Sequence, residues 1–495
     1  MKTIAWAAAM VILLALMPTA HAYEAFQGPT ELIYWDTNQT DNGYTLFGVG
    51  GTTYLIDMEG RVVHTWPIGT NPHLLDDGSI LDASNDDPSG FGGFAQVSWD
   101  GIEVWSYTET RTNYLPHHDF IRIFNPKLGT NTTLYTANKT VTQAQAIAAG
   151  CDPADGPYEG SQIDAIVEVD MSGNVVWEWW FFDHAVQDFD PTKSNYVASV
   201  SNAPGRINLN LPGRPVRRDW LHCNSLDYNA DLDQIVVNSV QGEFYVIDHG
   251  GTFIAGDPTG SIALAASSAG DFLYRFGDPA RYKQGNPPSI LTNWTESTTG
   301  NKQIGGAHHV SWIPEGFPGA GNFLVFNNSQ YLFEHTQASY VFEINGFLDA
   351  STNDTGAYVN PPVAGYDTWP APGSNADKAP KQMSRQIVWS YGSQASHGMF
   401  SHIGSSAQRL ANSNTLVCAD TEGHIIEVTP SGEAVWEYIN PDSSDGILKF
   451  KRDHWPMYNS LFRAYRYRAS DPPLLGRTLT PGSTITGRTP SYYSP

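Results

Sequence analysis

The hydrophobic pattern of this chain repeats as a hairpin-sized unit. Each copy has an apolar strand that ends in an acid, a turn that contains glycine, and a second apolar strand that carries tryptophan or an equivalent aromatic residue. Four copies are compact, at residues 52–66, 94–107, 166–179 and 425–438, and two are stretched by insertions, at residues 244–277 and 340–392. Alternation predicts half-buried strands, and glycine tolerates the positive φ of tight connections. The pattern therefore predicts six antiparallel hairpins.

A second pattern precedes most of these hairpins. A segment that begins with histidine is followed by another short apolar stretch, as at residues 78–81, 321–325 and 412–417. Two strands from this half and two from the hairpin make the four-stranded blade of a β-propeller. Helical periodicity is scarce, and only residues 140–149 are expected to form a helix. The five histidines that head the segments are His73, His118, His222, His308 and His402.

The expected fold is all-β, a six-bladed β-propeller of four-stranded antiparallel blades. The first unit begins at residues 43–50 and lacks a histidine-led half. A strand at residues 461–467 could complete it and so leave no open sheet edge. We expect a signal peptide at residues 1–22, the propeller at 23–468 and a C-terminal tail at 469–495.

The first 22 residues have the features of a cleavable export signal. Lys2 precedes an apolar run, and Ala20-His21-Ala22 ends the segment. The run is short for a membrane span of about 20 residues, so an uncleaved anchor is the weaker alternative. We therefore expect a periplasmic or secreted protein with no integral membrane segment after cleavage. A Cys151–Cys223 disulfide is an open alternative in such a compartment.

The formal net charge of −24 argues against a nucleic-acid partner or an anionic membrane, because phosphate binding depends on clustered Lys and Arg. A small anionic substrate would need cations close by. For any single arginine, a surface ion pair is the more common role. The candidate substrate-binding residues are Arg409, Arg463, Asn224 and Asn328, with Arg466 and residues 217–218 as further sources of positive charge.

In a radial repeat the innermost strands start around one axis, so histidines far apart in sequence would meet in one pore. A neutral imidazole is a nucleophile, and protonated neighbours can stabilise negative charge or protonate a leaving group. His118, His222, His308 and His402 are the catalytic candidates. A structural role, in which the ring is hydrogen-bonded, is favoured for His73, His117 and His309.

A metal site is an alternative use of the same residues. Histidines that converge with Asp119 or Asp219 could bind Zn, Mn or Fe. The sequence has no HxH or HExxH pair, and the Asp-rich stretches at 36–41, 76–77 and 227–233 lack the spacing of a known calcium loop. We therefore expect no cofactor, with Ca or another divalent metal as the alternative.

Several long motifs in order resemble the bacterial arylsulfate sulfotransferase family. The resemblance extends over residues 43–467, and its most specific strings are HHDF, DWLHCNSLDYN, WIPEG and FRAYRY. It implies a six-bladed propeller, exported to the periplasm, that moves a sulfuryl group between phenols without a nucleotide donor. The implied substrates are small phenolic compounds and aryl sulfates, and the oligomeric state stays open.

The resemblance also implies roles for individual residues. His222 and His308 match two channel histidines of the family, and His402 is the nearest counterpart of the histidine that carries the sulfuryl group, although His397 is close by. Relatives place an arginine shortly after the strand at 321–328, where this chain has none. Arg409, Arg463 or Arg466 would have to replace it. A metal-assisted propeller hydrolase or lyase, and a non-catalytic binding propeller, are the alternative functions.

Overall fold

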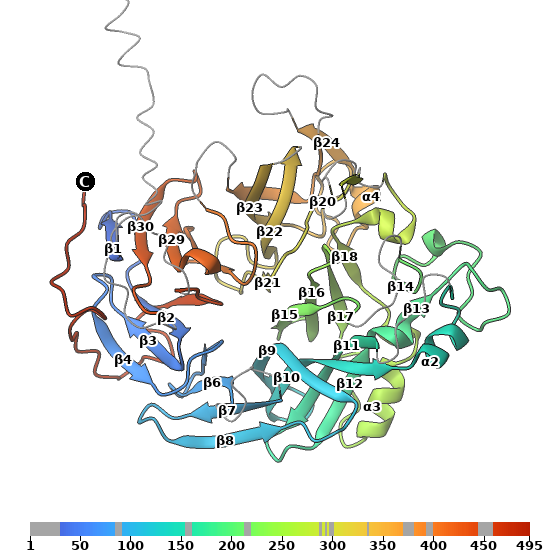
Figure 1. Ribbon diagram of the computed structural model, residues 1–495, viewed down its shortest axis with the longest axis horizontal. Coiled ribbons are helices and arrows are strands. Elements are labelled where there is room, and N and C mark those ends of the chain that lie inside the picture. Colours follow the sequence, from blue (N-terminus) through green and yellow to red (C-terminus); the bar gives the residue numbers. More distant parts are fainter. Residues whose placement is uncertain are drawn as a thin grey trace, which may run out of the picture.

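The computed structural model describes residues 30–84, 92–153, 161–211, 219–286, 290–292, 295–296, 301–333, 336–369, 381–392, 399–443 and 459–495. Over these residues the chain forms a ring of six antiparallel sheets around a central axis (Figure 1), and the innermost strands line a space there, which we call the pore. The predicted six-bladed β-propeller is confirmed.

Each of the first three blades has four strands, from the innermost strand outward. Blade 1 consists of β31 (Ala464–Tyr467), β2 (Tyr44–Val49), β3 (Thr52–Ile56) and β4 (Val62–Trp66). Blade 2 consists of β5 (His73–Leu74), β6 (Ile80–Ala83), β7 (Gly93–Val97) and β8 (Glu103–Thr108). Blade 3 consists of β9 (Tyr114–Asn125), β10 (Thr130–Val141), β11 (Ser161–Asp170) and β12 (Val175–Trp180).

The other three blades follow the same order. Blade 4 consists of β15 (Cys223–Asn229), β16 (Gln234–Ser239), β17 (Glu243–Asp248) and β18 (Tyr274–Phe276). Blade 5 consists of β21 (His309–Trp312), β22 (Phe323–Phe333), β23 (Thr336–Ile344) and β26 (Ile387–Tyr391). Blade 6 consists of β27 (Ser406–Arg409), β28 (Thr415–Ala419), β29 (His424–Val428) and β30 (Ala434–Ile439). All six predicted hairpins form the outer half of a blade.

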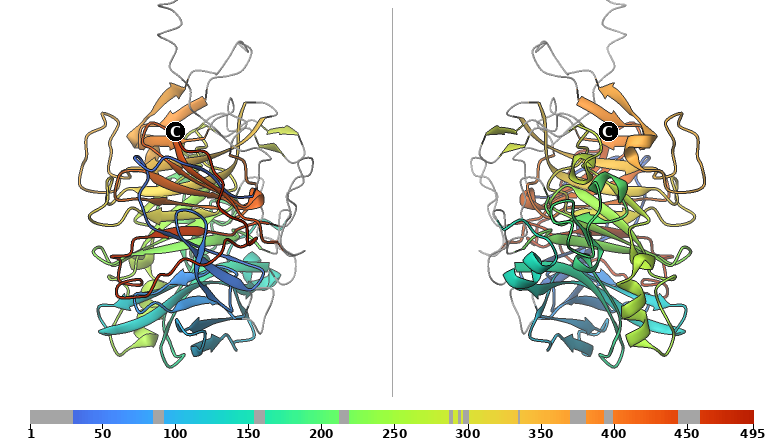
Figure 2. Two further views of the ribbon diagram at one scale, coloured as in Figure 1. Left: turned by 90° about the vertical axis from the view of Figure 1, so that its left-hand side faces the viewer. Right: turned by 90° about the vertical axis from the view of Figure 1, so that its right-hand side faces the viewer.

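Both ends of the described chain close the ring. As predicted, β31 pairs with β2, with Ala464 opposite Phe47. The sequence pattern did not predict β1 (Glu31–Trp35), which adds a fifth strand to blade 6 by pairing with β30. The expected tail at 469–495 packs along the outer side of the ring beside β1 and β4 (Figures 1 and 2). There Tyr493 donates its N–H to the Ile33 carbonyl and stacks on Tyr34.

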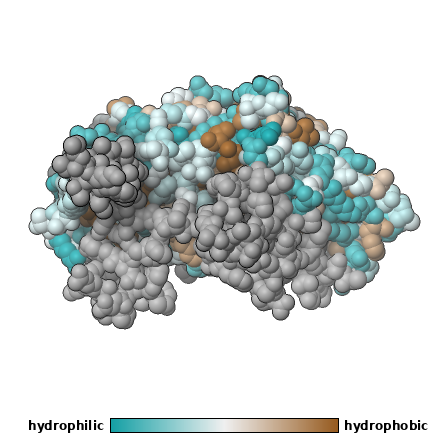
Figure 3. Space-filling model, turned by 90° about the horizontal axis from the view of Figure 1, so that it is seen from above, coloured by the Kyte–Doolittle hydropathy of each residue, from teal (hydrophilic) through white to brown (hydrophobic). Residues whose placement is uncertain are grey.

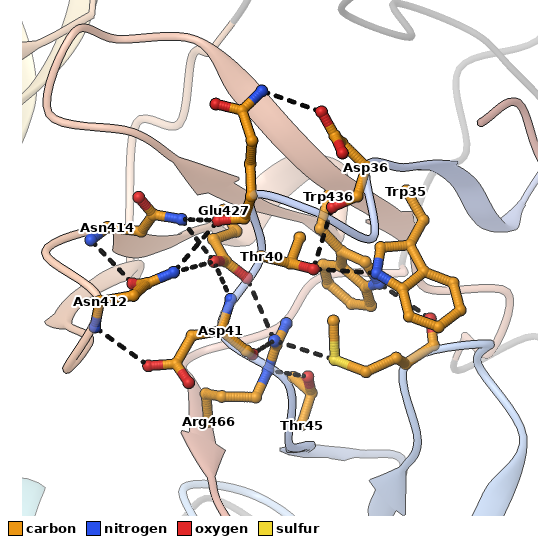
Figure 4. Close-up of polar contacts among 12 residues, drawn as sticks. Trp35, Asp36, Thr40, Asp41, Thr45, Asn412, Asn414, Glu427, Trp436 and Arg466 are labelled. Carbon is orange, nitrogen blue, oxygen red and sulfur yellow. Dashed lines mark hydrogen bonds and ion pairs between the residues drawn. The ribbon is translucent and has the colours of Figure 1, made fainter. Parts of the chain in front are cut away.

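A buried polar cluster joins blade 6 to blade 1 at this closure (Figure 4). Arg466 donates to the Asp41 carbonyl at 2.8 Å and to Thr45 Oγ1 at 2.9 Å, and its Nη1 lies 3.2 Å from Glu427 Oε2. Glu427 also accepts from the Asp41 N–H and from Asn414 Nδ2. The guanidinium of Arg466 therefore stabilises the closure between blades 6 and 1.

One large buried hydrophobic cluster lies between each pair of neighbouring blades, and two small clusters lie elsewhere in the described chain. One residue of each repeated hairpin adds a polar contact to this packing; it is the aromatic residue of the repeat in five hairpins, and His64 in place of Trp66 in the first. It donates a hydrogen bond to the following blade over 2.7–3.0 Å. The six donors are His64, Trp105, Trp177, Tyr274, Trp389 and Trp436, and their acceptors lie in residues Trp99, Met171, Thr252, Gln386, Pro430 and Met58. The repeat thus encodes a contact between blades.

Insertions between strands form short helices and two-stranded sheets outside the blades. The helix expected at 140–149 is α2 (Gln143–Ala148), which starts later because β10 continues to Val141 and Thr142 caps the helix. The sequence pattern did not predict α3 (Pro258–Ala265) or α4 (Pro361–Ala364). The small sheets pair β13 (Ala185–Val186) with β14 (Ile207–Asn208), β19 (Ile290–Thr292) with β20 (Thr295–Glu296), and β24 (Tyr366–Trp369) with β25 (Lys381–Ser384).

The described surface is in keeping with the composition. Figure 3 views the ring edge-on, and there the described surface is mainly hydrophilic with scattered hydrophobic patches. Among the described residues, no helix is long and apolar enough to cross a membrane. The open alternative of a Cys151–Cys223 disulfide is wrong, because the structure does not join these two buried cysteines.

Candidate functional site in the central pore

The innermost strands bring histidines from three different blades to one end of the pore. His118 lies in β9, His222 immediately precedes β15, and His308 immediately precedes β21. The His118 and His222 rings meet edge to face with centroids 4.6 Å apart. His308 is close enough that its charge would affect the pKa of His118. Three of the four catalytic candidates therefore share one site.

His117 joins this cluster, although the sequence favoured a structural role for it. Its Nδ1 lies 2.8 Å from Nδ1 of His118, and its Nε2 lies 3.3 Å from Asp164 Oδ1. The His117 and His222 ring centroids are 6.4 Å apart. The site is thus an array of four imidazoles with a buried carboxylate behind it.

The backbone is strained where it presents these side chains. His118, Asp219 and His222 have φ values of 56°, 61° and 52°, in the left-handed region that non-glycine residues rarely adopt. Such strain is retained where the surrounding structure enforces it, and it clusters at functional sites.

Asp219 pairs with His222 at the entrance of the site. Its Oδ2 lies 2.5 Å from His222 Nδ1, and the two side chains are 37% and 30% exposed. A carboxylate in this position fixes the imidazole tautomer and stabilises the protonated ring. The pair can therefore accept and return a proton while it remains open to a ligand.

His308 has the opposite environment. Its Nδ1 lies 2.8 Å from the Gly306 carbonyl and 3.1 Å from Asn328 Oδ1. Both partners are acceptors, so Nδ1 carries the hydrogen and Nε2 keeps the lone pair. Burial lowers the pKa of His308 to about 4, although these two hydrogen bonds oppose the shift. The ring is therefore neutral at pH 7, in the form that acts as a nucleophile.

His118 is also held neutral. Burial lowers its pKa to about 2, and the neighbouring His117, His222 and His308 act in the same direction. A charge on one ring of the array thus disfavours a charge on the next.

An ion pair crosses the pore below the histidines. Arg463, which immediately precedes β31, donates from Nη1 to Asp119 Oδ1 at 2.7 Å and from Nη2 to the Asn224 carbonyl at 3.1 Å. Burial alone would raise the pKa of Asp119, but the charge of Arg463 and the contact with His73 hold it well below its usual range. Asp119 also accepts from the Leu226 N–H at 2.8 Å. This pair forms the floor of the histidine site.

The proposed substrate-binding residues have different positions. Arg463 lies at the pore, whereas Arg409 turns away to pair with Glu343 at 2.6 Å between blades 5 and 6. Asn224 Nδ2 donates to the Ala307 carbonyl, so this amide supports the strand that follows His308. Asn328 contacts His308 directly. Residues 217–218 and His397 lie outside the described residues.

His402 lies at the rim of the site. It precedes β27 by four residues, and its side chain is exposed. Asn328 Nδ2 donates to the carbonyls of Ser401, Ile403 and Gly404 at 3.0–3.1 Å. The segment that contains His402 is therefore tied to His308 through one amide side chain.

The sequence analysis did not assign three residues of this site to the roles that the structure gives them. His117 was assigned to structure, Asp164 was not considered, and Asp219 was considered only as a metal ligand. Asp219 could have been recognised from its spacing, since an acid three residues before a histidine can reach the ring when the backbone turns between them. Asp164 precedes His222 by 58 residues, and the sequence carries no local signal for it.

No metal centre is evident in the part of the chain that the structure describes. Within it, no group of three or more His, Cys, Asp or Glu side chains is arranged to hold a metal ion. Asp119 is instead neutralised by Arg463, and Asp219 by its hydrogen bond with His222.

Several solved structures are distantly similar to this chain. A protein of unknown function from Bacteroides caccae is 12% identical, with a TM-score of 0.39, over 86% of this chain and 100% of that one. A functionally unknown protein from Desulfotomaculum acetoxidans DSM 771 is 7% identical, with a TM-score of 0.36, over 86% and 99%. The WD40 domain of Toxoplasma gondii coronin is 7% identical, with a TM-score of 0.35, over 83% and 74%. These values carry no argument about function.

No curated protein matches the sequence at a significant level. A family comparison is more informative, because the sequence model of Arylsulfotransferase (ASST) matches residues 146–345. The matched region contains His222, Asn224, His308 and Asn328. Residues 146–345 of this propeller therefore match the arylsulfotransferase family, which indicates aryl sulfotransferase activity in broad terms.

Proposed function

We propose that the protein is an exported sulfotransferase that moves a sulfuryl group from an aryl sulfate to a phenol through a histidine carrier, without a nucleotide donor. The observation that carries this proposal is the convergence of His118, His222 and His308 at one end of the pore, in a chain that matches the arylsulfotransferase family. Export and independence from nucleotides rest on the N-terminal segment and on the sequence resemblance.

His308 is the best nucleophile of the array. Its Nδ1–H is fixed by Gly306 and Asn328, so Nε2 presents a lone pair, and its lowered pKa keeps the ring neutral. In the first step Nε2 forms a bond to sulfur while the ester S–O bond breaks. The products are an N-sulfonated histidine and a phenolate. In the second step an acceptor phenolate attacks the same sulfur, which restores the neutral imidazole.

The Asp219–His222 pair supplies the proton transfers. Protonated His222 gives its proton to the departing phenolate, and the neutral ring then takes a proton from the acceptor phenol. Asp219, at 2.5 Å from Nδ1, stabilises the protonated ring between these two events. No proton is gained or lost over the cycle.

Arg463 supplies positive charge in place of the arginine that is absent after the 321–328 strand. It lies close enough to His308 to lower the pKa of that ring. Its partner Asp119 keeps it oriented and offsets part of its charge, but Arg463 still acts as a cation at His308, and burial strengthens this effect because charges interact more strongly in a low dielectric. A fixed cation below the nucleophile favours negative charge that develops on the sulfuryl oxygens.

His402 is the alternative carrier, because the sequence resemblance assigns it that role. Its segment is tied to His308 through Asn328, so a sulfuryl group could be received at either ring. The two possibilities differ in which residue gains the mass of a sulfuryl group.

The test is acceptor-dependent release of 4-nitrophenolate from 4-nitrophenyl sulfate, followed with and without phenol. We expect release that requires phenol, resists a chelator, and falls at least 10²-fold in His308→Ala. His64→Gln is the matched control. His64 lies on outer strand β4, away from the pore, and forms a hydrogen bond with the Trp99 carbonyl. Peptide mapping of a rapidly quenched sample locates the sulfated residue.

Each outcome has a definite meaning. Sulfation of His308 supports the carrier proposed here, and sulfation of His402 transfers that role to the rim. Loss of activity on chelation would favour the metal-assisted hydrolase or lyase. No turnover across a panel of phenols and aryl sulfates would refute sulfotransfer and leave a binding propeller.

A further inference from the structure

A cavity opens at the end of the pore away from the histidine site. Its volume is about 600 Å³, and all six innermost strands contribute to its wall. It is lined by residues that follow the histidine site along these strands, for example Ile121 after His118 and Leu226 after His222. The Asp119–Arg463 pair lies between the two sites, and Arg463 is itself part of the lining. The cavity is therefore distinct from the site to which we assign catalysis.

The wall of this cavity is apolar and partly open. Phe124, at the end of β9, is 60% exposed, and Phe317, Pro126 and Pro314 line the cavity with it. An aromatic side chain that stays this exposed beside a concave surface offers contact area to a ligand. A cavity of this volume matches the usual size of small-molecule sites.

The floor of this cavity, on the side of the Asp119–Arg463 pair, provides hydrogen-bonding groups. The Asp227 carboxyl accepts one backbone N–H at each oxygen, from Tyr228 and from Trp312, and each oxygen can accept another. His73 Nε2 is buried without a hydrogen bond, at 3.6 Å from Asp119 Oδ1. Ser311 adds a hydroxyl to the same lining. The floor can therefore both accept and donate.

Two of the three arginines that line the cavity are paired with carboxylates. Arg463 is bound to Asp119 and Arg409 to Glu343, at 2.7 and 2.6 Å. Arg122 turns its guanidinium over the Trp105 ring, toward blade 2. Burial raises the pKa of Asp227 to about 7, and burial also lowers the pKa of His309 to about 3. An organic anion would have to compete with Asp119 and Glu343 for Arg463 and Arg409, while Arg122 is turned toward Trp105 and Gln96.

We propose that this cavity is a second small-molecule site, and that it binds a neutral aromatic molecule carrying a hydrogen-bond donor, with the ring against Phe124 and Phe317 and the donor directed to Asp227. This inference does not depend on sulfotransfer at the histidine site. It would hold for a propeller with any chemistry at the opposite end.

The test uses 2-naphthol as the probe and isothermal titration calorimetry with the full chain. His308→Ala weakens the phenol site expected at the histidines, so binding that persists in this variant reports this cavity. We expect Phe124→Ser to weaken that binding at least fivefold. Ile102→Ser is the matched control, because Ile102 is 63% exposed immediately before β8 and is not among the cavity-lining residues, so binding should be unchanged.

Two further measurements make the proposal refutable. Ser311→Trp places a large ring in the cavity and should abolish the binding, with circular dichroism to verify the fold. 2-Naphthoate, which has the same rings and a negative charge, should bind at least tenfold more weakly. Unchanged binding in both Phe124→Ser and Ser311→Trp would overturn the site, and equal affinity for naphthoate would overturn its preference for neutral ligands. Absence of sulfotransfer would leave both results as they stand.

Discussion

Removal of the charge of Asp119 tests whether the ion pair across the pore holds the ring together. In Asp119→Asn the side chain keeps its shape but has one acceptor oxygen instead of two. At present Oδ1 accepts from Arg463 Nη1, and Oδ2 accepts from the Leu226 N–H. One of these buried donors must then lose its acceptor, and Arg463 remains buried without a counter-charge.

Breaking a buried ion pair by removing one partner costs about 3–5 kcal/mol. With a urea slope of about 3 kcal/mol per molar, the unfolding midpoint should fall by about 1–1.7 M. The measurement is tryptophan fluorescence during urea titration. Asp257→Asn is the control, since Asp257 caps α3 through a side-chain oxygen and Asn caps equally well.

The double variant Asp119→Asn/Arg463→Met completes the test. It removes the unpaired charge, so it should be more stable than Asp119→Asn alone. A loss below 1 kcal/mol in the single variant, or a double variant as unstable as the sum of both single changes, would refute the reasoning.

Three other predictions follow from the structure. Asp219→Asn should lower sulfuryl transfer at least 10²-fold with little change in Tm, because Asp219 is 37% exposed and holds the tautomer of His222; equal losses of activity and stability would contradict a positioning role. Although burial opposes it, hydrogen bonds with Asp233 and Glu168 raise the pKa of His249 to about 9. Protonated His249 therefore gives the folded state its full stabilisation below about pH 6.5, and this free energy falls by up to about 3 kcal/mol as the pH rises through 9. In urea titrations at several pH values, His249→Gln should show a smaller decline in stability over this range. Trp436→Phe should cost about 2–3 kcal/mol and Trp105→Phe less than about 1 kcal/mol, because the former bond to the next blade is buried and the latter exposed. Equal losses would show that burial does not set the strength of these bonds.

The sequence predicted the fold because the propeller is built from one local pattern. Each hairpin can be recognised from alternating apolar and polar residues, a turn with glycine and an aromatic residue. Residues 461–467 could be recognised as the missing strand of blade 1. The strand β1 was not predicted, since Glu31–Trp35 is a single short segment whose partner, β30, lies about 400 residues away.

The site was predicted in outline only. Placement of histidines at strand starts correctly indicated that His118, His222 and His308 converge. Which polar groups support them depends on contacts between blades, as for Asp164 behind His117. The direction of an arginine side chain could not be predicted from the sequence either. Arg409 ends an innermost strand and Arg463 precedes one. Arg409 packs between sheets against Glu343, whereas Arg463 reaches across the axis to Asp119.

The position of Arg463 has a consequence for biosynthesis. This residue comes from the last 33 positions of the sequence, while its partner Asp119 is made early. A growing chain can stack blades 2 to 6 as they emerge, but the floor under the histidines is completed only after β31 docks beside β2. Partial translation products that end before β31 should therefore lack the Arg463–Asp119 pair beside the histidines.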